Sequence, residues 1–155
     1  MTLLVGIGNR LRGDDGVGPV VADHVAALGI PGLTVETDLE PVAVLHRLTR
    51  PPLHAHVVLL DATAPLGDPG RIQVVRMPGD RLSVPAGPVG SHGLGVAEVL
   101  ELARALDVLP PRLTVVGVEA EACPLGSALS DTVSRCVPDA VALVTAIVAQ
   151  QLGTR

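Results

Sequence analysis

The stretch TLLVGIGNRLRGDDGVG, residues 2–18, decides the fold of this chain. It opens with a nearly continuous apolar run, Thr2 to Ile7, which predicts a strand covered on both faces. A glycine-rich turn follows, and Pro19 to Leu28 then has the pattern of a helix, with Gly29 as its stop signal. A buried strand that passes through such a turn into a helix is typical of a parallel sheet with crossover helices.

The same alternation continues to the end of the chain. Further strands are predicted over residues 33–37, 56–61, 71–77 and 113–118, and further helices over 41–48, 95–106 and 130–152. Residues 64–70 and 78–90 are predicted to be a turn and a loop, and Pro138 is expected to break or kink the last helix. The pattern predicts one α/β domain over residues 1–155. It is a three-layer α/β/α sandwich with a twisted, mostly parallel sheet of about five strands, in which 71–77 is an exposed edge strand.

Composition excludes several classes of function. The 155 residues are 48% hydrophobic and 17% charged, which suits one compact domain, and they contain no Phe, Tyr or Trp. Without aromatic side chains, and with a net charge of -5, the chain is not expected to bind nucleic acid. All 11 basic residues are Arg, so a Walker lysine and a Schiff-base cofactor are excluded and no organic cofactor is expected.

The cellular location is predicted from the first residues of the chain, the length of its apolar runs and its cysteines. The first residues lack the basic region of a signal peptide, and no apolar run approaches the length of a membrane span. The two cysteines form no C-x-x-C pair, so we expect two buried or half-buried free thiols. A cytoplasmic protein without membrane contact is therefore predicted.

Polar side chains are predicted in three places at one edge of the sheet. Asp14 and Asp15 lie in the first turn, Asp61 ends the third strand, and His92 lies in the loop before the third helix. Ligands bind beyond the carboxyl ends of the strands in open parallel sheets. Two carboxylates and one imidazole would suit Zn²⁺, Ni²⁺ or another first-row divalent ion.

Each of these features has an alternative interpretation when it is taken alone. The Gly6-x-Gly8 start resembles a dinucleotide-binding turn, but Leu11 stands where the third glycine is required. The aspartate pair could form a turn or cap a helix, and a single acid at a strand end could do the same. A lone histidine beside a glycine is more often an ordinary polar residue than a ligand.

Other polar residues are predicted to lie outside the site or at its margin. His54 and His56 share a strand face at the opposite end of the third strand, where we expect a solvated or structural role. Glu119 follows the fifth strand and is expected on a solvated rim. Cys123 and Cys136 have no neighbouring histidine that would activate a thiol.

Taken together, the motifs resemble those of the hydrogenase maturation peptidases, which process the large subunit of [NiFe] hydrogenases. The opening GIGN, Leu11 and GDDGVG at 13–18 carry the resemblance first. It continues through LDA at 60–62, GDPG at 67–70, SHGL at 91–94, VGVE at 116–119 and the helix start at 129–138. The similarity covers nearly the whole chain in the same order.

This resemblance implies an endopeptidase that removes the C-terminal tail of a nickel-loaded [NiFe] hydrogenase large-subunit precursor. Asp15, Asp61 and His92 match the family's metal-contacting and catalytic residues, and the nickel would arrive with the substrate. The precursor is the implied partner, and a monomer is expected. Asp15 stands where the family often has Glu, and the loop TDLEP at 37–41 is more acidic and stiffer than the family's glycine-rich loop.

Two alternatives remain at this stage. One is a different metal-dependent hydrolase, which would hold its metal permanently, and the other is a chaperone that binds a hydrogenase subunit without cutting it. The sequence has no G-x-S-x-G or H-E-x-x-H motif, so a serine hydrolase of that type and an ordinary zinc protease are not supported.

Overall fold

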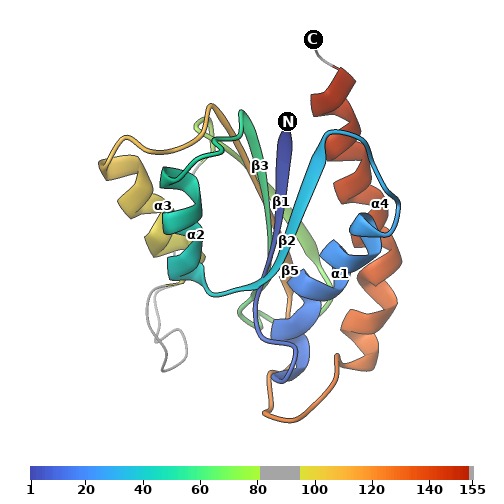
Figure 1. Cartoon of the computed structure of the whole chain (residues 1–155). Helices are drawn as coiled ribbons and strands as arrows, with labels where there is room; N and C mark the ends of the chain where they lie inside the picture. Colours follow the sequence, from blue (N-terminus) through green and yellow to red (C-terminus); the bar gives the residue numbers. More distant parts are fainter. Residues whose placement is uncertain (81–94, 154–155) are drawn as a thin grey trace.

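The computed structural model describes residues 1–80 and 95–153, and this part of the chain folds around one sheet. Its strands are β1 (Thr2–Ile7), β2 (Leu33–Leu39), β3 (His56–Thr63), β4 (Ile72–Met77) and β5 (Arg112–Glu119). They lie in the order β2-β1-β3-β5-β4 (Figure 1). Only β4 runs antiparallel, against β5, so the mostly parallel sheet and its predicted edge strand are confirmed.

Helices cover both faces of this sheet, which confirms the three-layer prediction. α1 (Val17–Ala26) and α4 (Asp131–Gly153) pack on one face (Figure 1). α2 (Pro41–Thr49) and α3 (Val96–Ala105) pack on the other. A short 3-10 turn, η1 (Gly13–Gly16), joins the loop after β1 to α1. The carboxyl ends of β1, β2, β3 and β5 therefore meet at one edge of the sheet.

Small aliphatic side chains fill both halves of the core. The half under α1 and α4 contains Leu4, Val58 and Val116, and the half under α2 and α3 contains Leu3 and Leu59. β1 and the first five residues of β3 are buried throughout, as their apolar runs predict. Without aromatic rings, the stability of this core depends on many small contacts.

Gly18 lets α1 lie directly on the sheet. A Cβ atom at this position would be 2.4 Å from the carbonyl oxygen of Ile7 and 2.6 Å from that of Leu60. Both atoms belong to backbone that pairs inside the sheet, so neither can move freely. The close approach brings the start of α1, and the loop before it, against the ends of β1 and β3.

Two predicted features of the elements were wrong in detail. Pro138 does not break α4, which continues through it. Proline leaves the Ser134 carbonyl without its helical donor, but both residues are exposed, so water can hydrate that oxygen. The third strand also continues past Asp61, because Asp61, Ala62 and Thr63 pair with the end of β5.

α4 is long and apolar enough to cross a membrane by length and composition. In this structure it packs as a core helix instead. Val133, Val137, Ala140, Val144 and Val148 form its buried face and join the core beneath α1. Its exposed face carries polar residues such as Arg135 and Asp139.

Candidate active site

The loop after β1 fixes the position of Asp15. Gly8 has a φ of 129°, and a Cβ atom there would be 1.9 Å from the carbonyl oxygen of Asp15, so only glycine fits. The Asn9 backbone N–H donates to Asp15 Oδ2 at 2.8 Å, and the Leu11 N–H donates to Asn9 Oδ1 at 2.9 Å. Asp15 is half-buried at the carboxyl edge of the sheet.

Asp61 lies on β3 beside this loop, and the structure brings it together with Asp15. Burial raises the pKa of the Asp61 carboxyl well above its usual range, and the negative charges of Asp15 and, less strongly, Glu40 raise it further. A hydrogen bond from the Ala62 N–H acts in the opposite direction. Two carboxylates that disfavour each other's charge form a place where a cation is stabilised.

The third predicted site residue, His92, lies outside the described residues. Within residues 1–80 and 95–153, no group of three or more His, Cys, Asp or Glu side chains could hold a metal ion. Asp15 and Asp61 thus form the part of the predicted site that the structure describes, and the metal-binding role of all three residues stays a prediction. The chemistry of the described pair, two anionic oxygens on neighbouring elements, fits a divalent cation.

Asp14, the other acid of the first turn, has a structural role whose partners the sequence did not reveal. Its side chain is fully buried and accepts hydrogen bonds from the N–H groups of Glu121, Ala122 and Ser130 at 2.9, 3.1 and 2.7 Å. The Ser130 hydroxyl donates a further bond at 2.9 Å. Burial would raise the pKa of Asp14, but these hydrogen bonds outweigh it and lower the pKa. Asp14 therefore ties η1 to the segment between β5 and α4.

Glu119 has the same role in a second loop, so its predicted solvated position was wrong. It is buried at the end of β5, and its Oε1 atom accepts bonds from the N–H groups of Leu66 and Asp68 at 2.5 and 2.8 Å. The backbone bond from Asp68 is the main cause that lowers its pKa. Glu119 thus holds the loop after β3. An acid at the end of a mostly apolar strand was the signal in the sequence.

An arginine of the loop after β1 binds the acidic end of β2, which continues to Leu39 rather than ending at Thr37 as predicted. Asp38 has a φ of 61°, a conformation that glycine favours, and Arg10 donates to both of its carboxylate oxygens at 2.6 and 3.1 Å. Arg10 also contacts Asp23 of α1 at 2.6 Å. The hydrogen bonds from Arg10 lower the pKa of Asp38. Arg10 therefore holds a non-glycine residue in a glycine-type conformation where the register between β1 and β2 shifts.

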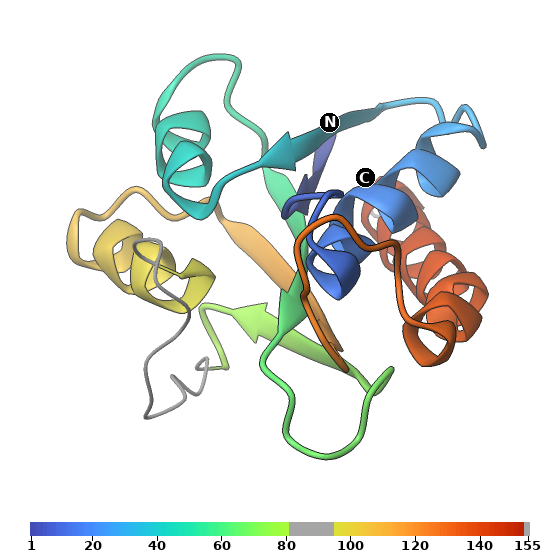
Figure 2. The ribbon, with the colours of Figure 1, turned by 90° about the horizontal axis from the view of Figure 1, so that it is seen from below.

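Figure 2 views the molecule along this edge. The loops that follow β1, β3 and β5 gather there, with the segment between β5 and α4 beside the loop after β1. The backbone confirms this neighbourhood, because the Gly13 N–H donates to the Ser127 carbonyl at 3.0 Å.

The two cysteines are free thiols. Cys123 lies in the segment between β5 and α4 and is exposed, contrary to expectation, whereas Cys136 is half-buried as expected.

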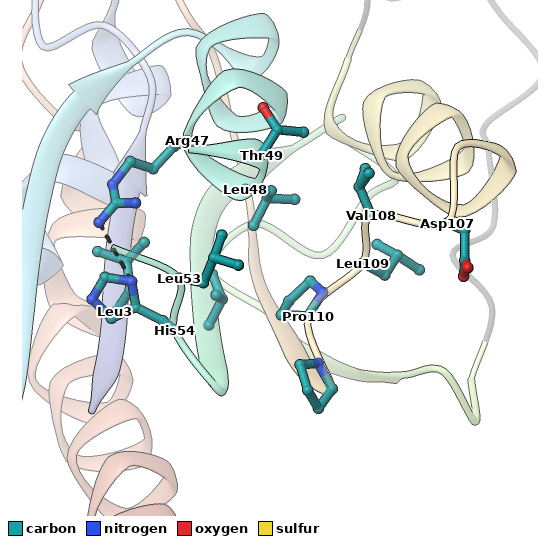
Figure 3. A pocket seen from close by; sticks show the side chains of 12 residues that line it. Leu3, Arg47, Leu48, Thr49, Leu53, His54, Asp107, Val108, Leu109 and Pro110 are labelled. Atoms are coloured by element: carbon teal, nitrogen blue, oxygen red, sulfur yellow. Dashed lines mark hydrogen bonds between the residues drawn. The ribbon is translucent and has the colours of Figure 1, made fainter. Parts of the chain in front are cut away.

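A pocket of about 320 Å³ lies at the opposite end of the sheet (Figure 3). Its walls are mainly apolar, and its polar groups pair with each other. The Arg47 guanidinium contacts His54 Nδ1 at 3.4 Å and Glu36 at 2.7 Å.

His54 and His56 are both buried at this end of the sheet, which fits the structural role expected for them and not the solvated one. Burial lowers the pKa of His56 to about 4, and that of His54 is also lowered. This pocket lacks the carboxylate pair of the candidate site.

Comparison with known proteins identifies the family and supports the fold. A model of the HycI hydrogenase maturation protease family matches residues 40–147. The hydrogenase maturating endopeptidase HybD of E. coli is 27% identical, covers 97% of this chain and 93% of its own, and superposes with a TM-score of 0.73. A solution structure of an Escherichia coli endopeptidase is 26% identical over 97% of this chain and 94% of its own, with a TM-score of 0.75.

More distant matches and a search of curated proteins complete the comparison. The [NiFe] hydrogenase maturation protease HycI of Thermococcus kodakarensis shares the fold at 21% identity, with a TM-score of 0.68 over 94% of this chain and 90% of its own. No curated protein sequence matches the chain significantly. The family match spans more than half of the chain and includes Asp61, whereas the structural matches cover nearly all of it. The chain therefore belongs to the hydrogenase maturation protease family and is an endopeptidase.

Proposed function

We propose that this endopeptidase cuts the C-terminal tail from a nickel-loaded [NiFe] hydrogenase large-subunit precursor. Asp15, Asp61 and His92 recognise the nickel, which belongs to the substrate. The observation that carries the proposal is the Asp15–Asp61 pair, in which burial and the neighbouring carboxylate raise the pKa of Asp61. A substrate that brings its own cation relieves this repulsion, so nickel-loaded precursor is bound in preference to nickel-free precursor.

The reaction adds water to the scissile carbonyl carbon, breaks the C–N bond and leaves a carboxylate and an amine. A bound divalent ion would polarise that carbonyl or make the water more acidic. Asp15 is held by the Asn9 N–H, which orients one of its two carboxylate oxygens. A carboxylate oxygen of the pair that does not contact the ion can accept the proton from water and pass it to the leaving amine.

The test is a gel assay of precursor processing with and without nickel. Asp15→Asn, Asp61→Asn and His92→Ala are expected to abolish processing of the nickel-loaded precursor, because each removes one donor to the cation. Wild-type protein is expected to leave the nickel-free precursor uncut. Equal cleavage of both precursors, or full activity of the His92 variant, contradicts the proposal.

Asp107→Asn serves as a matched control. Asp107 follows α3 at the opposite end of the sheet, with a φ of 55°, a conformation that asparagine also tolerates. The substitution removes the same charge and is expected to leave processing unchanged. Metal analysis of the purified protein adds a second readout, because a permanently bound stoichiometric metal would favour a different metal-dependent hydrolase.

A further inference from the structure

Three strongly exposed leucines stand on the loops that surround Asp15 and Asp61. Leu11 follows β1, Leu66 follows β3 and Leu125 follows β5, and their exposed fractions are 67%, 74% and 81%. β1, β3 and β5 are neighbours in the sheet, so the three loops meet at the same edge (Figure 2). We call Leu11, Leu66 and Leu125 the leucine rim.

Backbone hydrogen bonds hold the loops of the leucine rim in place. The Gly126 N–H donates to the Leu11 carbonyl at 2.6 Å, which joins the loops after β1 and β5. Glu119 accepts the N–H of Leu66 itself at 2.5 Å. Asp14 accepts the N–H groups of Glu121 and Ala122 just before Leu125. Each leucine is therefore presented on an ordered backbone.

Single exposed leucines are common on protein surfaces and need no explanation by themselves. The difference here is the way their loops are built. Asp14 and Glu119 are both buried, and the protein hydrogen bonds that they accept come from loop backbone N–H groups and one serine hydroxyl. Burying a carboxylate and ordering a loop both cost free energy. Side chains that are already ordered lose less entropy when a partner covers them.

We propose that the leucine rim is the docking surface for the precursor, where it covers apolar side chains next to the scissile bond. This inference rests on the proposed function. The three loops follow strands whose carboxyl ends lie at the edge that carries Asp15 and Asp61, so the leucine rim is continuous with the site. The occupant is a folded protein with an apolar patch around its cleavage segment, because three separate loops contact it together.

The experiment measures KM and kcat for cleavage of the nickel-loaded precursor by Leu66→Gln and Leu125→Gln variants. Glutamine keeps the length of the side chain and adds no charge next to the carboxylates. Apolar contact made equally in the ground and transition states changes KM and not kcat. Each variant is expected to raise KM by about 5-fold or more, as the loss of roughly one well-buried interface side chain does, with kcat unchanged.

Leu53→Gln and Leu106→Gln are matched controls at the opposite end of the molecule. Their leucines are 70% and 56% exposed and lie before β3 and directly after α3. Both controls are expected to keep the wild-type KM. Far-UV circular dichroism against temperature checks that all four variants fold alike.

Four results would overturn the inference. An unchanged KM in both rim variants shows that the precursor does not contact the leucine rim, while cleavage by the wild type leaves the proposed function intact. An equal rise in the controls shows a non-specific effect. A wild-type dimer that Leu125→Gln converts to a monomer, seen by light scattering, assigns the surface to a second copy of the chain. If the wild type cuts no precursor at all, the proposed function and this inference both fail.

Discussion

Asp14 and Asp15 are adjacent in the sequence and have different surroundings. Asp14 points into the protein, where four hydrogen bonds stabilise its charge. Asp15 lies beside Asp61 at the sheet edge, where its charge raises the pKa of a second acid. Asp14 therefore stabilises the loop. Asp15 instead lowers stability through its repulsion of Asp61, at a site where a bound cation would offset that repulsion.

Replacing Asp61 by asparagine is expected to abolish processing and to stabilise the free protein. The pKa of Asp61 is raised on folding from an unfolded value of about 3.9. The favourable contribution of this group is complete below that unfolded value and is lost as the pH rises through the folded value. Urea unfolding at pH 8 in the presence of a chelator, followed by far-UV circular dichroism, checks the direction. A less stable Asp61→Asn variant would contradict it.

Asp14→Asn is expected to have the opposite effect on stability. The amide keeps the shape but loses the charge, and it turns an NH₂ group towards some of the donors that Asp14 accepts. The free energy of unfolding is expected to fall by about 1–3 kcal/mol, the cost of unsatisfied buried polar groups. Urea unfolding at pH 7 measures it. The activity per folded molecule is expected to fall less than in Asp15→Asn, because Asp15 remains.

At the level of elements, the contact of α1 with β1 and β3 sets the position of the first loop. Gly18 stands inside a helix, where alanine would ordinarily be favoured by about 1 kcal/mol. The Cβ of alanine would overlap the carbonyl oxygens of Ile7 and Leu60, and this effect is larger. Helix propensity and packing therefore oppose each other at this position, and packing decides.

Gly18→Ala is accordingly expected to lower the free energy of unfolding by about 3 kcal/mol or more. Gly153→Ala is the matched control, because Gly153 is also helical and has open space around it. The control is expected to be neutral or slightly stabilising. Urea unfolding of both variants compares them, and an unchanged stability in Gly18→Ala would show that α1 can shift away from the sheet.

Leu59 tests how the aliphatic core is packed between β3 and the helices α2 and α3. Its side chain is fully buried, so Leu59→Ala is expected to cost about 2–5 kcal/mol through lost burial and a residual cavity. Urea unfolding measures the change. The exposed Leu106→Ala serves as the comparison and is expected to stay within about 0.5 kcal/mol of wild type.

At the level of the whole molecule, the buried carboxylates link the stability of the loops to pH. Asp14 and Glu119 have lowered pKa values in the folded protein, against unfolded values of about 3.9 and 4.3. Their contribution is present above the unfolded values and is lost as the pH falls through the folded ones. Unfolding free energies measured from pH 6 to pH 2 are expected to decrease below about pH 4, and less steeply in Asp14→Asn.

The sequence predicted the fold because local patterns specify its elements. The apolar runs of β1 and β3 and the helical spacing of α1 need no distant partner to be recognised. The rule that ligands bind at carboxyl ends of strands pointed to Asp61 and to the Asp14–Asp15 pair, and only the family resemblance selected Asp15 from that pair. The roles of Asp14 and Glu119 depend on partners 51 to 116 residues away, which no local pattern contains. The choice between a solvated and a structural role for His54 stayed open for the same reason, since the burial of a strand entrance depends on distant segments.

The bond between Asp14 and Ser130 has a consequence for biosynthesis. The first loop leaves the ribosome early, but Ser130 is made 116 residues later, which takes roughly 6–23 s at ordinary rates of translation. β5, which completes the centre of the sheet, is also a late segment. The hydrogen bonds that hold Asp14 in the first loop therefore cannot form in a nascent chain until residues 121–130 have been synthesised.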